Sequence, residues 1–368
     1  MKIKELIYRP LLAAWLIGWG CLLTNCSGSD SSDGSDDVID RPEPQDGTQY
    51  LRLASLTRSG EDPAQADPMK GKDVHLFLVK QGAVDQSGNV RYNGIDNNGG
   101  EMSVGGDLLL VKPGTDYQVF GFMPAMGTSS TLVVNETTGT MTVNGLPTVT
   151  GEDICVVIGV KAGLPTEEQP ITPGAFGYHA PENTSLGYGI SLLAEHLYSA
   201  AELKFKIDAE YRKLRHIVLK QVTLKNESNT VNVTIPFNIG NSLEPVGAIS
   251  VSPPAGSGTA SLPLYEPDGG QELQTDATVN VSFYFLPGQA SNLLIESVYD
   301  VYDTTGTPGT ENGPAPIRTD CIIQNNLTTL LGSLARGAKK NVTMTIKPTY
   351  LYVLSDPDAD TPMVVAGD

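Results

Sequence analysis

The chain has few cysteines, histidines and basic residues for its length. Its 368 residues include 4 cysteines, 4 histidines and 2 tryptophans, and 24 lysines and arginines stand against 42 aspartates and glutamates. The formal net charge of −18 repels phosphate backbones, which excludes nucleic acid as a partner. It also repels anionic lipid, so membrane attachment must come from a lipid group rather than from a charged protein surface.

The small number of cysteines argues against a fold held together by disulfides. Cys21 and Cys26 lie near the N-terminus, while Cys155 and Cys321 are too far apart for a zinc-binding motif. Cys155 lies in an apolar run, which favours a buried free thiol, and a Cys155–Cys321 disulfide is the alternative. Stability is therefore expected to come from the burial of apolar side chains.

Patterns that carry chemistry are also lacking. The histidines are scattered, the serine-rich stretches contain no nucleophile-elbow pattern, and the paired glycines precede no helix that would bind phosphate. His196, near the entry to a strand, is interpreted as a packing residue. The sequence predicts no catalytic residue, no metal site and no cofactor, and we expect that the protein is not an enzyme.

The longest apolar stretch near the N-terminus, Leu11–Leu23, has the length of a secretory signal and falls short of the roughly 20 residues that span a bilayer. It ends in Leu23-Thr24-Asn25-Cys26, which resembles a bacterial lipobox, although Asn25 replaces the usual small residue. We predict a lipoprotein signal peptide over residues 1–25 and lipidation of Cys26, with Cys21 as the alternative. Two or more acyl chains, such as palmitate, would hold the chain firmly in the outer membrane.

The segment that follows is predicted to be a disordered acidic tether. Residues 26–46 are rich in Ser, Gly and Asp and contain almost no apolar side chains. Such a segment cannot bury enough surface to offset the entropy lost on ordering.

The rest of the chain is predicted to be all-β. Apolar and polar residues alternate over 201–208, which is the period of a strand with one wet face, whereas 73–80 is apolar on both faces and indicates a central strand. Residues 217–224 form another predicted strand with a bulge near Lys220, and 326–335 a short helix. Regularly spaced short strands with turns between them predict antiparallel β-sandwiches.

The predicted boundaries follow from proline and turn residues. An N-terminal β-sandwich domain is expected over 47–165 and a C-terminal one over 190–355. Between them the proline-rich segment 166–189 has the composition of a linker. A tail occupies 356–368.

The body resembles the fimbrillin family of Bacteroidales-type surface lipoproteins. The resemblance rests on the lipobox, the passage Leu192–Phe205, the run Phe285-Leu286-Pro287-Gly288 and the closing strand Asn341–Lys347. It implies two transthyretin-like domains and a surface-exposed role as a structural or adhesive component of fimbriae, whether subunit, tip or anchor. The implied partners are other fimbrial subunits, the outer membrane through the lipid, and a ligand on a host or bacterial surface.

The resemblance also implies assembly by β-strand complementation, in which one chain donates a strand to the sheet edge of another. In that family, cleavage after an arginine removes the first strand, and Arg58 stands just after the first predicted strand, 50–56. The alternative is an arginine in a surface loop. The predicted donor is Tyr350, Leu351, Tyr352, Val353 and Leu354, with 362–366 as a second apolar stretch; the alternative is that 350–354 closes its own sheet.

A surface glycan-binding lipoprotein is the alternative function. Proteins of that kind present exposed aromatic side chains that stack on sugars, and Tyr299, Tyr302, Tyr350 and Tyr352 are the candidates. Tyrosines in strands are also common as core residues.

Overall fold

The structure is a computed structural model that describes residues 47–58, 71–92, 109–123, 131–182, 189–237, 249–252, 258–288, 293–306, 308, 313–347 and 363–367. Contacts divide the chain into two compact units, Met1–Glu43 and Pro44–Asp368, and the described residues all belong to the second. The predicted signal peptide, Cys26, the tether and the donor segment Tyr350–Leu354 lie outside the described residues. Among the residues that are described, no helix is long and apolar enough to cross a membrane.

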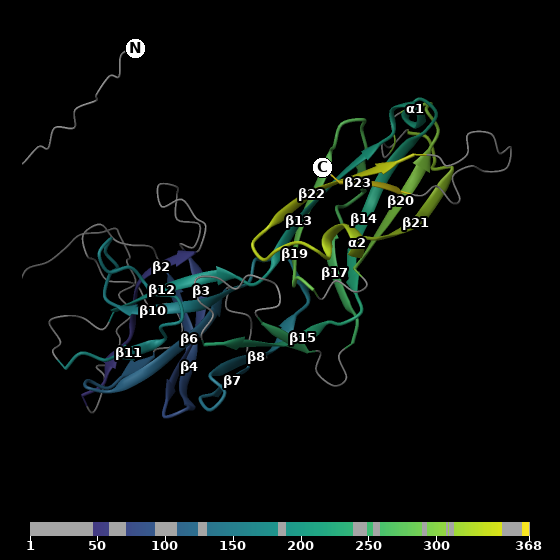
Figure 1. Ribbon diagram of the computed structural model, residues 1–368. Coiled ribbons are helices and arrows are strands. Elements are labelled where there is room, and N and C mark those ends of the chain that lie inside the picture. The colour runs from purple at the N-terminus through teal and green to yellow at the C-terminus, as the bar shows by residue number, and fades with distance from the viewer. Residues whose placement is uncertain are drawn as a thin grey trace, which may run out of the picture. The chain divides into compact units, whose positions relative to one another are not determined.

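The first half of the body is a seven-stranded sheet with the order β2-β12-β10-β6-β3-β4, in which β11 also pairs with β6 (Figure 1). Its strands are β2 (Arg52–Arg58), β3 (Lys72–Lys80), β4 (Ala83–Tyr92), β6 (Asp116–Met123), β10 (Cys155–Ala162), β11 (Gly177–His179) and β12 (Gly189–His196). A four-stranded sheet has the order β16-β15-β8-β7. Its strands are β7 (Thr131–Asn135), β8 (Thr140–Pro147), β15 (Thr230–Pro236) and β16 (Ser250–Ser252), while β1 (Gln49–Tyr50) pairs with β5 (Leu110–Val111).

Both faces of the seven-stranded sheet are apolar. On β3, Val74, Leu76 and Leu78 enter one hydrophobic cluster, which we call the inner cluster. Phe77 and Val79 point to the other face and enter the junction cluster, which lies between this sheet and the four-stranded sheet. The prediction that 73–80 is a central strand packed on two sides is thereby confirmed.

The second half is a sandwich of two sheets around a third cluster, to which both sheets contribute buried side chains. One sheet has the order β23-β22-β13-β19-β9 and the other β17-β14-β20-β21, with β18 paired to β14 (Figure 1). The strands are β9 (Val149–Thr150), β13 (Ser199–Ile207), β14 (His216–Asn226), β17 (Ala260–Tyr265), β18 (Gln271–Glu272), β19 (Val279–Phe285), β20 (Leu294–Tyr302), β21 (Arg318–Asn326), β22 (Lys339–Ile346) and β23 (Met363–Gly367). The helices are α1 (Ala209–Arg212) and α2 (Thr328–Leu331).

The all-β, sandwich-type fold is confirmed, and among the described strands two pairings depart from the antiparallel arrangement. β2 runs parallel to β12, and β13 runs parallel to β22. Local expectations also hold. Every second residue of β13 is buried, and the pairing of β14 with β20 skips a residue between Leu219 and Gln221, which places the predicted bulge at Lys220. The predicted helix over 326–335 is present as the single turn α2.

The two halves share strands. β9 from the first half joins the sheet of β19, and β15 and β16 from the second half complete the sheet of β8 and β7. The segment 166–189, predicted as a linker, contains β11, which pairs with β6. Strand β12 lies between β2 and β10 and so belongs to the seven-stranded sheet. The chain therefore passes into the sandwich of the second half only at Leu197 and Tyr198, just before β13, and not at residue 190, where the sequence predicts the start of the second domain.

The two body cysteines are present as thiols, Cys155 buried and Cys321 half-buried. The buried thiol expected for Cys155 is confirmed, and the two cysteines do not form the alternative disulfide with each other. Burial raises the pKa of the Cys321 thiol.

Gly121 on β6 provides a test of the packing between β6 and β3. A Cβ added there would lie 2.6 Å from the carbonyl oxygen of His75 and 2.7 Å from Leu76 Cδ2. Because a backbone atom cannot move aside easily, we expect Gly121→Ala to lower the free energy of unfolding by about 1–3 kcal/mol. Gly177→Ala on β11 is the matched control, since a Cβ there meets nothing within 4 Å. Chemical denaturation of both variants measures the difference, and equal stabilities would contradict the close packing of β6 on β3.

Candidate functional site

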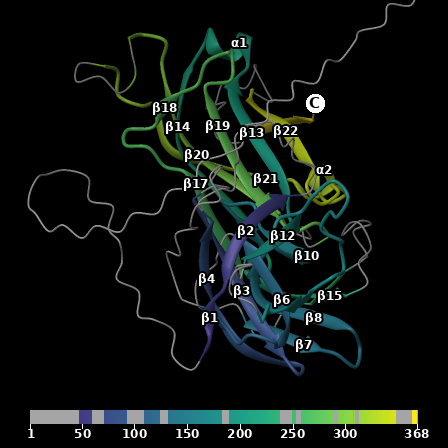
Figure 2. The same cartoon turned by 90° about the vertical axis from the view of Figure 1, so that its left-hand side faces the viewer.

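Strand β2 lies at the end of the seven-stranded sheet, beside β12. It pairs in parallel with β12, from Arg52 opposite Gly189 to Arg58 opposite Ala194. Figure 1 and Figure 2 both show β2 in purple next to β12. A terminal strand held by one neighbour in the ladder is the one that a sheet exchanges with the smallest loss of backbone hydrogen bonds, and parallel pairing is slightly weaker per residue than antiparallel pairing.

Apolar side chains hold β2 in place. Leu53 and Leu56 of the strand, with Leu51 just before it, are buried in the inner cluster beside Ile190 and Leu192 of β12. Full burial of each leucine contributes about 1.5–3 kcal/mol. Removal of the strand would therefore open an apolar groove along β12, flanked by unpaired backbone groups, which another strand with similarly spaced apolar residues can fill.

A chain of two hydrogen bonds, the first of them buried, fixes the register between the two strands. The hydroxyl of Ser55 donates to Ser191 Oγ at 2.7 Å, and the hydroxyl of Ser191 donates to the carbonyl of Gly163 at 2.7 Å. At Gly189 the strands come so close that an added Cβ would lie 3.2 Å from the Cβ of Ala54. A donor strand in the place of β2 would need a small polar residue opposite Ser191.

Arg58 is the last residue of β2, and its backbone lies opposite Ala194. The sequence predicts it just after the first strand; the structure includes it in the strand. Residues 59–70, which follow the predicted cleavage point, lie outside the described residues, as does the Arg58 side chain.

The second apolar stretch considered as a donor pairs within its own chain. Strand β23 runs antiparallel to β22, from Met363 opposite Ile346 to Gly367 opposite Val342. It therefore occupies the edge of a sheet of the second sandwich, as an added strand does in strand complementation.

The aromatic residues proposed for glycan binding are only partly within the described residues. Tyr299 is 2% exposed and Tyr302 is 9% exposed, so neither presents a ring face to solvent. Burial raises the pKa of both phenols. Tyr350 and Tyr352 lie outside the described residues. The glycan-binding alternative therefore has no described exposed aromatic among its candidates.

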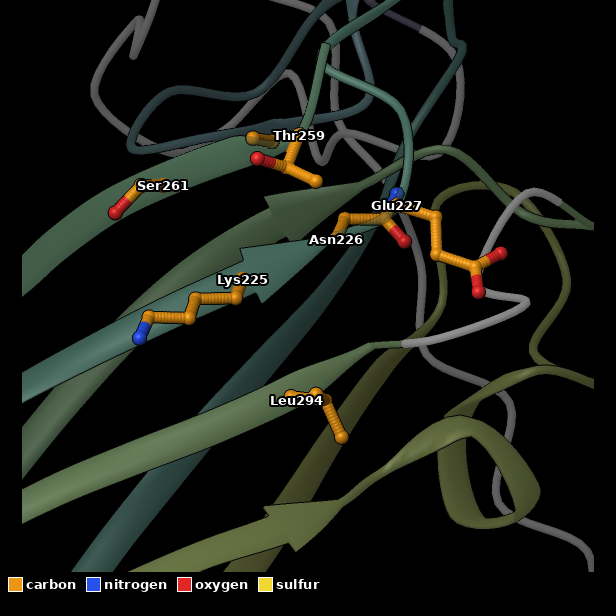
Figure 3. Close-up of a pocket in the computed structure, with 7 residues that line it drawn as sticks. Lys225, Asn226, Glu227, Thr259, Ser261 and Leu294 are labelled. Carbon is orange, nitrogen blue, oxygen red and sulfur yellow. The ribbon is translucent and has the colours of Figure 1, made fainter. Parts of the chain in front are cut away.

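A surface pocket of about 310 Å³ lies at the end of β14 and is lined by Lys225, Asn226, Glu227, Thr259, Ala260, Ser261 and Leu294 (Figure 3). The ammonium of Lys225 donates a hydrogen bond to the Glu296 carboxylate at 2.7 Å, and the side-chain amide of Gln324 donates to the same carboxylate at 2.6 Å. These bonds hold the pKa of Glu296 below its ordinary value, and the bond from Lys225 has the larger effect. The lining includes no histidine or cysteine, so it offers no pairing of a nucleophile with an imidazole base.

The pairing of β12 with β2 is the part of this site that sequence reasoning does not find. The sequence pattern assigns 192–205 to the opening of the second domain, whereas 189–196 form a strand of the first sheet. The sequence does contain a signal for this strand. Ile190, Leu192 and Ala194 are apolar on one face, and Leu193 is apolar on the other, which is typical of a strand packed on both sides.

Comparison with known proteins gives matches among solved structures. No family model and no curated protein matches the chain. A fimbrial protein from Bacteroides vulgatus is similar over 86% of this chain and 98% of its own, with 13% identity and a TM-score of 0.41. The fimbrial anchor protein Mfa2 from Porphyromonas gingivalis is similar over 85% of this chain and 95% of its own, with 9% identity and a TM-score of 0.33. Both are fimbrial proteins of the kind that the sequence resembles, but at these values the likeness assigns no function to this chain.

Ser55 on β2 and Ser191 on β12 allow a test of how β2 is held, because alanine at the two positions removes different numbers of hydrogen bonds. Ser191→Ala removes the acceptor of the buried Ser55 hydroxyl, which is left unpaired, and also removes the bond to the carbonyl of the exposed Gly163, and we expect a loss of about 1–3 kcal/mol. Ser55→Ala leaves the bond from Ser191 to Gly163 intact, and we expect a loss of about 1 kcal/mol or less. Unfolding midpoints in denaturant measure both. A larger loss for Ser55→Ala than for Ser191→Ala would contradict these donor directions.

Proposed function

We propose that this chain is a cell-surface lipoprotein that serves as a structural or adhesive component of fimbriae, with a binding rather than a catalytic role. The observation that carries the proposal is β2, a parallel strand at the end of its sheet that covers an apolar groove and ends at Arg58. A protein whose sheet has one such exchangeable strand is suited to joining copies of itself or related subunits by strand addition.

In this proposal β2 acts as an internal plug. While it is present, the leucines and the serine bond keep the groove closed and the chain monomeric. Cleavage after Arg58 would separate β2 from the rest of the body and leave it held by non-covalent contacts alone. A donor strand from another subunit can then displace it, because the donor restores the same backbone bonds and apolar contacts.

The lipid part of the proposal rests on the sequence. Cys26 would carry the acyl chains that hold the precursor in the outer membrane, and residues 27–46 would separate it from the body. A cut after Arg58 would release the body from its lipid, so an uncut chain fits an anchor and a cut chain fits a polymerising subunit. Other fimbrial subunits are the proposed partners, with a ligand on a host or bacterial surface.

Cleavage at Arg58 tests the assembly mechanism. Treatment of the purified full chain with an arginine-specific protease is expected to give a body that begins at Ser59 and forms high-mass species on gels of unheated samples. Arg58→Ala should remain monomeric, because β2 stays attached. Arg52→Ala, at the other end of the same strand, is the matched control and should behave like the natural chain. A body that begins at Ser59 and remains monomeric would contradict strand exchange.

Lipidation is tested separately by labelling cells that express the chain with a palmitate analogue. We expect label on the natural chain and on Cys21→Ser, and none on Cys26→Ser. The label is measured on the immunoprecipitated protein. Retention of label by Cys26→Ser would reject Cys26 as the acylated residue.

A further inference from the structure

Three side chains that carry metal-binding atoms meet at the end of the seven-stranded sheet. Cys155 is the first residue of β10 and lies opposite His196, the last residue of β12. Asp153 precedes Cys155 by two residues. His196 Nδ1 lies 2.7 Å from Asp153 Oδ2, and Cys155 Sγ lies 3.7 Å from His196 Nδ1 and 3.8 Å from Asp153 Oδ2. One sulfur, one nitrogen and one oxygen atom therefore converge on a single point.

This arrangement does not suit nucleophilic catalysis. In a triad of nucleophile, histidine and acid, the imidazole contacts the nucleophile through one ring nitrogen and the acid through the other. Here the thiol and the carboxylate both approach Nδ1 of His196. The thiol is also completely buried, so a substrate carbonyl could not reach it.

The same arrangement suits a tetrahedral metal ion. With bonds of about 2.3 Å to sulfur and about 2.0 Å to nitrogen and oxygen, the donor atoms of a zinc site lie roughly 3.3–3.6 Å apart. The two distances from sulfur, 3.7 and 3.8 Å, are close to this range. Only the 2.7 Å separation of Nδ1 and Oδ2 must increase, by about half an ångström, as the metal replaces their hydrogen bond.

The surroundings hold the imidazole in place while leaving access to it. Gly337 covers the ring so closely that an added Cβ would lie 3.1 Å from His196 Cδ2. Gly337 is in turn fixed by its amide, which donates to the carbonyl of Tyr198 at 2.8 Å. The side chains of His196 and Asp153 remain 19% and 14% exposed, which gives an ion a route to the buried sulfur.

We infer that Asp153, Cys155 and His196 bind a divalent transition-metal ion, Zn²⁺ by the chemistry of the donors, with a fourth position open to water or to a ligand from a partner. Mixed sulfur, imidazole and carboxylate donors favour zinc over calcium or magnesium, which take oxygen donors. The ion would link β10 to β12 at the end of β12, just before the chain continues into β13 of the second sandwich. This inference is independent of the fimbrial role.

The test uses a single-thiol form of the full chain. Because the chain contains 4 cysteines, C21S, C26S and C321S leave Cys155 as the one thiol. Titration with Zn²⁺ in a calorimeter is expected to show one ion bound per chain. Co²⁺ should give the charge-transfer absorption of a thiolate ligand, and added Zn²⁺ should remove this absorption by displacing Co²⁺. Binding should weaken as the pH falls, because the metal must displace protons from its ligands.

Variants assign the ligands. Cys155→Ser should abolish the charge-transfer band, and His196→Gln and Asp153→Asn should each weaken Zn²⁺ binding by at least about tenfold. The matched control is His179→Gln, because His179 Nδ1 also lies 2.7 Å from a carboxylate, that of Asp116, with no thiol in the pair. This control should bind Zn²⁺ like its parent.

Circular dichroism of the metal-free variants checks that they fold. If Cys155→Ser does not fold, the Co²⁺ charge-transfer band of the single-thiol parent, whose one thiol is Cys155, and its loss on addition of a chelator still decide the question. Absence of stoichiometric Zn²⁺ binding, or a charge-transfer band that survives Cys155→Ser, would overturn the inference.

Discussion

The pairing of β8 with β15 is the interaction on which the rest of the structure depends. It joins strands from the two halves of the chain, with Val143 opposite Val233 and Met141 opposite Ile235. These side chains belong to the junction cluster, which also contains Phe120 and Phe122 from the seven-stranded sheet. Both halves contribute strands to this sheet and side chains to this cluster, so the two halves share one sheet and one hydrophobic cluster.

Tyr198 locks the same junction from the connection between β12 and β13. It is completely buried, its hydroxyl donates to the carbonyl of Pro147, and burial raises its pKa well above the ordinary value. Because the phenol stays protonated, it remains a donor throughout the physiological range. The strands on either side of it, β12 and β13, thereby keep fixed positions in their two sheets.

The junction would allow the proposed exchange of β2 to occur without loss of the fold. The leucines of β2 enter the inner cluster and contribute nothing to the junction cluster. Loss of β2 therefore removes apolar contacts on one face of β12 while the contacts between the seven-stranded and four-stranded sheets remain. A sheet packed on two faces by separate clusters can give up an edge strand from one cluster and remain anchored through the other.

Sequence reasoning succeeds where the signal is local. The alternation over 201–208 and the bulge at Lys220 depend on neighbouring residues in one strand, and both are found. Pairing between distant strands has no such signal. The parallel alignment of β2 with β12 joins residues more than 130 positions apart, as the bond between Ser55 and Ser191 shows (a separation of 136). Composition predicts a linker at 166–189, but this proline-rich segment also contains β11, which pairs with β6, and the pairing has no signal in composition.

The donor cluster of Asp153, Cys155 and His196 is also not predicted from the sequence, because it depends on the pairing of distant strands. The sequence predicts a buried thiol at Cys155 and a packing residue at His196, with nothing that connects the two. Only the register of β10 with β12 makes them neighbours. That register also relates the cluster to β2. Arg58 lies opposite Ala194, two residues before His196 on the same strand, so the end of β2 and the donor cluster lie at the same end of β12, on its two opposite edges. An ion bound there would hold β12 to β10 while its other edge stands open, and an acceptor strand that is already fixed loses less conformational entropy when a partner strand binds.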